Sequence, residues 1–130
     1  MSQEDLGTLQ LVDAWRHCVR TLLACAHACI AASDAWRLDA TSPGRAARLH
    51  ACNDAAGRCL AAHTSMGEHV DPTPELVECA EACRHAEAIC LGLAEVHLPC
   101  RAASVACRRC TEACLDLAWR IRSERATATA

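Results

Sequence analysis

The 130-residue sequence has no Phe, no Tyr and no Lys, and it holds only five Gly and four Pro. Strands are rich in aromatic and β-branched residues that alternate with polar ones, and this alternation is almost absent here, which argues against β and α/β folds. Ala, Leu, Arg and Glu are abundant instead, and all four are strong helix formers. We therefore predict an all-α protein.

Two further absences bear on location and partners. We find no run of about 18 apolar residues, so we expect no membrane-spanning helix. The first residues, Met1 to Asp5, are acidic where a secretory or twin-arginine signal would be basic. These features predict a cytoplasmic protein with no membrane partner. The net charge of -3 and the pI near 6.1 argue against nucleic acid as a partner.

The length suits one domain over residues 1–130 with a core of its own. Twelve residues are Cys. Because a domain of this size does not need disulfides to fold, and because the cytosol keeps thiols reduced, the cysteines indicate metal or thiol chemistry before disulfides.

Proline marks three expected helix starts, since Pro43, Pro74 and Pro99 each suit the first helical position. Counting from them predicts four helices at about 5–38, 43–67, 74–97 and 99–123, with a frayed tail over 123–130. The connections are short, so consecutive helices should be antiparallel neighbours. We predict an up-down-up-down four-helix bundle.

All twelve cysteines fall on the predicted helices, where successive cysteines are 3, 4 or 7 residues apart. An α-helix turns about 100° per residue, so these gaps keep the cysteines of each helix on one narrow stripe. The other stripe positions are apolar and the opposite faces are charged, so the stripe should face the core. We call these residues the cysteine stripe: Cys18, Cys25, Cys29, Cys52, Cys59, Cys79, Cys83, Cys90, Cys100, Cys107, Cys110 and Cys114.

Three interpretations of the stripe differ in chemistry. Cysteine can be an inert core residue, although ordinary core preferences would place Leu, Ile and Val at so many positions. Disulfides are restricted to pairs across helices, because cysteines seven residues apart on one helix lie roughly 10 Å apart. Metal binding is the interpretation that we favour.

The net charge of the metal–thiolate complex distinguishes between a divalent and a monovalent ion. A tetrathiolate site that holds Zn²⁺ keeps a net charge of about -2, so three such sites would bury about six negative charges with no cation on the stripe to offset them. A Cu(I) ion replaces one proton per thiol, so a one-to-one array stays neutral, and thiolates select Cu(I) by softness. We therefore predict Cu(I) as the bound ion.

Three weaker soft ligands continue the stripe, namely His63, Met66 and His97. In an antiparallel bundle, the first two would lie at one mouth of the core and His97 at the other, where weak ligands suit ion entry or transfer. Each has packing as its alternative role. Four histidines lie off the stripe and should face solvent: His17, His27, His50 and His85.

Cys107 and Cys110 form the only C-x-x-C motif. In a βαβ context this motif would indicate a dithiol redox site, but that context is missing. An iron–sulfur cluster also uses four thiolates, although the compact spacing of ferredoxins is absent.

Two cysteine-rich segments, 79–83 (CAEAC) and 107–114 (CRRCTEAC), resemble the four-helix-bundle copper storage proteins of bacteria. The resemblance extends over nearly the whole chain, from Cys18 to Leu117. It implies inward cysteines that line a tube of Cu(I) ions, a cytosolic member of the family, and a homotetramer. The stripe is thinner here than in typical members, which implies a lower capacity. Its interruptions are Leu22, Ala56, Ala86, Leu93 and Ala103.

Together these features predict a non-enzymatic protein that stores or sequesters several Cu(I) ions through core thiolates. The alternatives are a thiol redox or iron–sulfur protein that uses the same cysteines, and a structural bundle with inert thiols.

Overall fold

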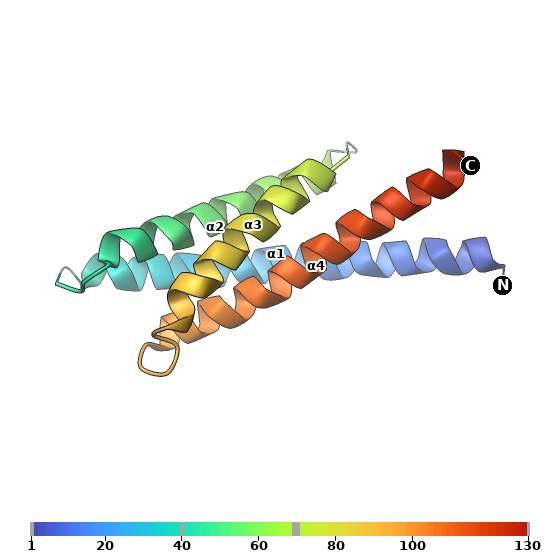
Figure 1. Cartoon of the computed structure of the whole chain (residues 1–130). Coiled ribbons are helices and arrows are strands. Elements are labelled where there is room, and N and C mark those ends of the chain that lie inside the picture. The colour runs from blue at the N-terminus through green and yellow to red at the C-terminus, as the bar shows by residue number, and fades with distance from the viewer. Residues whose placement is uncertain (1, 40, 69–70, 130) are drawn as a thin grey trace.

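The computed structural model describes residues 2–39, 41–68 and 71–129, which form a four-helix bundle (Figure 1). The helices are α1 (Gln3–Leu38), α2 (Arg45–Gly67), α3 (Thr73–Leu91) and α4 (Leu98–Thr129). No strand occurs in this part of the chain, so the all-α prediction is confirmed there.

The helices pack as a ring around one axis. α1 contacts α2 and α4, and α3 contacts the same two helices. In Figure 1 the α1–α2 and α3–α4 connections lie at one end of the bundle, and the α2–α3 connection lies at the other. One face of every helix therefore turns toward a shared core.

Local signals explain how the first two helices begin. Ser2 caps α1, because its hydroxyl accepts a hydrogen bond from Asp5 N at 3.2 Å while the Asp5 carboxylate accepts one from Ser2 N at 3.4 Å. Gly44 precedes α2 with φ at 74°, a left-handed conformation that suits glycine. For this reason α2 begins at Arg45, later than the predicted start at 43.

Two further helix boundaries correct the prediction. α3 ends at Leu91 rather than at 97, because residues 92–96 form tight turns with hydrogen bonds such as Leu93 N to Cys90 O at 3.1 Å. α4 continues to Thr129 instead of fraying from 123. An ion pair of 2.8 Å joins Arg125 in this last part of α4 to Asp71 in the segment before α3.

α1 is long and apolar enough to cross a membrane by composition alone, with a mean hydropathy of 1.2 over its most apolar window. The expectation that no segment would qualify is therefore wrong by this measure. The buried residues of α1 include Cys18, Cys25 and Cys29, which face the other helices. Core helices of bundles satisfy the same criterion, so the finding is weak evidence for a membrane.

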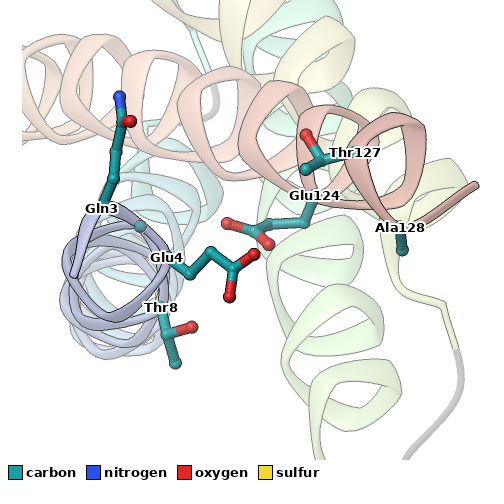
Figure 2. A pocket seen from close by; sticks show the side chains of 7 residues that line it. Gln3, Glu4, Thr8, Glu124, Thr127 and Ala128 are labelled. Atoms are coloured by element: carbon teal, nitrogen blue, oxygen red, sulfur yellow. The ribbon is translucent and has the colours of Figure 1, made fainter. Parts of the chain in front are cut away.

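A polar cleft lies between the first turns of α1 and the last turns of α4 (Figure 2). The carboxylates of Glu4 and Glu124 point toward one another across it. No cysteine lines the cleft, so it is separate from the thiol chemistry of the core.

Candidate metal centre

All twelve cysteines are free, and each has 0% of its surface exposed. The prediction that the cysteine stripe faces the core is confirmed. The rest of the core is mostly alanine with a few leucines, so sulfur makes up much of its volume. No charged side chain is buried in the described part of the chain.

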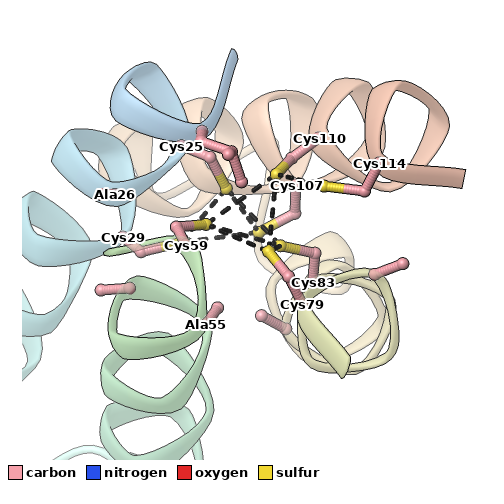
Figure 3. Packing of buried hydrophobic residues seen from close by; sticks show 14 of the residues in the cluster. Cys25, Ala26, Cys29, Ala55, Cys59, Cys79, Cys83, Cys107, Cys110 and Cys114 are labelled. Atoms are coloured by element: carbon pink, nitrogen blue, oxygen red, sulfur yellow. Dashed lines mark hydrogen bonds between the residues drawn. The ribbon is translucent and has the colours of Figure 1, made fainter. Parts of the chain in front are cut away.

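Nine thiols form one connected cluster, linked by Sγ–Sγ distances of 3.5 to 4.0 Å. At its centre each helix contributes one cysteine, and these four sulfurs lie within 4.8 Å of one another (Figure 3). The four are Cys25, Cys59, Cys83 and Cys110. We call the whole group the nine-thiol cluster; its other members are Cys18, Cys29, Cys79, Cys107 and Cys114.

The spacing of these sulfurs fits metal coordination. A disulfide requires sulfurs about 2.05 Å apart, whereas the nearest pair in the cluster, Cys29 and Cys107, is separated by 3.5 Å. Two thiolates bound to one ion at about 2.3 Å in tetrahedral geometry lie about 3.8 Å apart. The cluster therefore holds its sulfurs at the separation of ligands that share an ion.

Hydrogen bonds between buried thiols shift the pKa values of neighbouring cysteines in opposite directions. The hydrogen bond with Cys107, and then the one with Cys110, lower the pKa of the Cys25 thiol. The hydrogen bond with Cys107, reinforced by burial, raises the pKa of Cys29. These hydrogen bonds favour the thiolate at Cys25 and the neutral thiol at Cys29. Metal binding must displace the thiol protons, so ion uptake will release them.

The other three thiols lie in a second group, which we call the end trio: Cys52, Cys90 and Cys100. Cys52 Sγ and Cys90 Sγ are 3.7 Å apart. Cys100 adjoins Cys90, and burial, followed by the charge of Cys90, raises the pKa of the Cys100 thiol to about 12.

Alanines separate the two groups of thiols. On α2, α3 and α4, the stripe position between the end trio and the nine-thiol cluster is an alanine with at most 5% of its surface exposed. We call these residues the alanine layer: Ala56, Ala86 and Ala103. No hydrogen bond between thiols crosses this layer among the described residues. The interruptions of the cysteine stripe therefore divide the thiols into two sets.

The end trio has a distinctive set of neighbours. The Trp36 side chain, 2% exposed, stacks on the His97 ring with centroids 4.4 Å apart. The guanidinium carbon of Arg48 lies 4.9 Å from the centre of the Trp36 ring. Its charge acts to lower the pKa of the Cys90 and Cys100 thiols, and so partly offsets the hydrogen bond with Cys52 that raises the pKa of Cys90 and the burial that raises the pKa of Cys100.

Arg48 was missed by the sequence reasoning, which expected no cation on the stripe. A signal was present, because Arg48 precedes Cys52 by four residues and therefore lies on the same face of α2. The earlier expectation is thus corrected at this end of the core.

The three predicted non-thiol ligands differ in their surroundings. Met66 is buried and His63 is half-buried. His97 precedes α4 and caps it, because its Nδ1 accepts a hydrogen bond from Cys100 N at 3.1 Å. This contact leaves His97 Nε2 as the ring atom open to a metal. The off-stripe histidines His17, His27, His50 and His85 are exposed, as predicted.

The two cysteines of the C-x-x-C motif do not hydrogen-bond to each other through their thiols. Cys107 contacts the thiols of Cys25 and Cys29, whereas Cys110 contacts thiols that include Cys59 and Cys114. A redox dithiol must reach its substrate, and both of these thiols are fully buried.

The buried cysteines lie close enough together to hold metal ions, and the thiolate donors favour soft ones. This conclusion rests on the residues of this chain, since comparisons with protein-family models, curated proteins and solved structures found no match.

Proposed function

We propose that this protein stores or sequesters Cu(I), binding several ions through thiolates in its bundle core. The observation that carries the proposal is the nine-thiol cluster, in which sulfurs from all four helices lie 3.5 to 4.0 Å apart. A single structural metal site needs four ligands at most. A continuous array of nine thiols suits several ions that share bridging sulfurs.

Charge supports a monovalent ion for this cluster. No charged residue is classed as buried in the described part of the chain, and Arg48 acts on the end trio, so no cation next to the nine-thiol cluster offsets the charge of a divalent tetrathiolate there. Each Cu(I) ion replaces one thiol proton and leaves the array neutral. Iron–sulfur and thiol redox functions remain the alternative uses of the same cysteines.

The remaining parts of the proposal follow from the resemblance to bacterial copper storage proteins. We propose a cytoplasmic, non-enzymatic protein that assembles as a homotetramer on an up-down-up-down bundle. The positions of the three connections at alternating ends of the bundle support this topology. By limiting free Cu(I), such a protein would protect other thiols and keep a reserve of copper.

An anaerobic titration of the reduced, metal-free protein with Cu(I), against a chromophoric competitor, tests the proposal. We expect about nine ions for the nine-thiol cluster at one ion per thiol, with helical circular dichroism retained. The control replaces Cys25, Cys59, Cys83 and Cys110 with Ser, which should remove most of this capacity.

Several outcomes would contradict copper storage. Saturation of the wild-type protein at one ion or none would exclude a store. Reconstitution with iron and sulfide to a stable chromophore, with weak Cu(I) binding, would favour an iron–sulfur protein. A redox activity lost on replacing only Cys107 and Cys110 would favour the dithiol alternative.

A further inference from the structure

The end trio is structurally separate from the proposed copper store. Its members come from three helices, and the 3.7 Å between Cys52 Sγ and Cys90 Sγ matches two ligands of one ion. The alanine layer lies between the trio and the nine-thiol cluster, and alanine has no donor atom for a metal. An ion held by the trio therefore has no bridging sulfur in common with ions in the larger cluster.

Two buried donor groups at the trio lack acceptors. Trp36 Nε1 and Arg48 Nε are both buried without a hydrogen-bond partner. Leaving buried donors unpaired is costly, and a negatively charged group beside them would accept their hydrogen bonds. A metal-bound thiolate of Cys100, which lies beside Trp36, supplies that charge.

A divalent ion would leave uncompensated negative charge in the nine-thiol cluster, but at the trio Arg48 can balance that charge. Three thiolates and one divalent ion carry a net charge of -1, and the guanidinium of Arg48 adds +1. Binding is balanced as one M²⁺ and three thiols giving one tris-thiolate complex and three protons. The site is then neutral without any further cation.

We propose that the end trio is a second, independent metal site that binds one soft divalent cation of the Zn²⁺ type, with Arg48 supplying the balancing charge. This assignment does not depend on copper binding by the nine-thiol cluster. It gives the protein two kinds of site, a multi-ion thiolate array and a single-ion site beside Arg48.

Titration of the reduced, metal-free protein with Zn²⁺ against a chromophoric competitor tests the proposal without copper. We expect one tight equivalent per chain in the wild-type protein. Cys90→Ser should abolish it, whereas Cys83→Ser, an equally buried change in the nine-thiol cluster, should retain it. Co²⁺ in place of Zn²⁺ should give thiolate-to-metal charge-transfer absorption with the same dependence on Cys90.

The role of Arg48 has its own matched pair of variants. Arg48→Gln should weaken Zn²⁺ binding about tenfold, since it removes a charge next to the complex. Arg58→Gln removes a surface arginine that pairs with Glu78 and should leave the affinity unchanged.

Three results would overturn the assignment: no tight Zn²⁺ binding, binding lost in Cys83→Ser but kept in Cys90→Ser, or equal affinities for the two arginine variants. X-ray absorption at the zinc edge of the one-to-one wild-type complex provides a check that requires no variant. It should report about three sulfur ligands, and a sulfur-free shell would exclude the trio.

Discussion

Replacing Cys83 tests directly whether the ions in the nine-thiol cluster bridge neighbouring sulfurs. The Cys83 sulfur lies 3.7 Å from that of Cys25 and 3.9 Å from those of Cys59 and Cys79. Cys18, by contrast, contacts a single thiol, that of Cys114, at 4.0 Å. The two residues are equally buried, so Cys83→Ser and Cys18→Ser differ in how many sulfur pairs they break.

The size of the effect follows from these contacts. At one ion per thiol each variant loses about one Cu(I) ion with the thiol itself, and any other ion that bridged to the lost sulfur keeps a single thiolate and should be released to the competitor. Cys83→Ser breaks three sulfur pairs and should therefore remove about three ions, whereas Cys18→Ser breaks one pair and should remove about one. Both variants place a hydroxyl among thiols in a buried site, which should lower the free energy of unfolding of the metal-free protein by about 1 to 2 kcal/mol. Because this cost is shared, the difference in stoichiometry isolates the connectivity.

The assay is the anaerobic Cu(I) titration on the wild type and both variants, with circular dichroism confirming the helical fold of each. Equal losses of Cu(I) from the two variants would refute the reasoning, since independent single-thiol sites predict the same loss at every cysteine. A smaller loss at Cys83 than at Cys18 would do so more strongly.

Two further predictions concern the metal-free fold. The pKa of Cys100 is raised to about 12 by burial and then by Cys90, so the folded state favours the neutral thiol; the stabilisation is fully present below about pH 9 and lost as the pH rises toward 12. The melting temperature should therefore be steady from pH 6 to 8 and fall above pH 9, and a constant value to pH 11 would contradict this. Leu22 is 0% exposed beside the nine-thiol cluster, so Leu22→Ala should lower the free energy of unfolding by about 3 kcal/mol in chemical denaturation, whereas Leu38→Ala, at an exposed site, should change it little.

The periodicity of the cysteines was enough to predict four helices and a core of inward thiols. The prediction succeeded because gaps of 3, 4 and 7 residues place the cysteines on one face of a helix, whatever that helix packs against. The end of α3 was less predictable, because residues 92–96 contain only one glycine and retain helix-forming residues such as Leu93 and Ala94, yet they form turns. Short-range turn geometry competed there with helix propensity.

The division of the thiols into two groups could not be predicted from the sequence. Ala56, Ala86 and Ala103 were recognised as interruptions of the stripe, but their common level in the bundle depends on how three helices slide relative to one another. That registration is set by the packing of side chains and by the geometry of the connections, which periodicity does not encode. The position of Arg48 beside the core thiols was not predicted for a simpler reason, because charged residues were assigned to the outer faces of the helices.

The unequal lengths of the helices have a consequence for local stability. α1 has 36 residues and α3 has 19, which correspond to about 54 Å and about 28 Å of helix. Among the described residues, α1 has no buried residue before Cys18, and α4 has none after Ala118. Leu11, Trp15 and Ile121 pack against the core from these stretches but are only partly buried, so the amides there should exchange with deuterium faster than those of the core, by local opening without global unfolding. The slow-exchanging part of the molecule then coincides with the part that contains the thiols, and proteases should trim the protein back toward that part first.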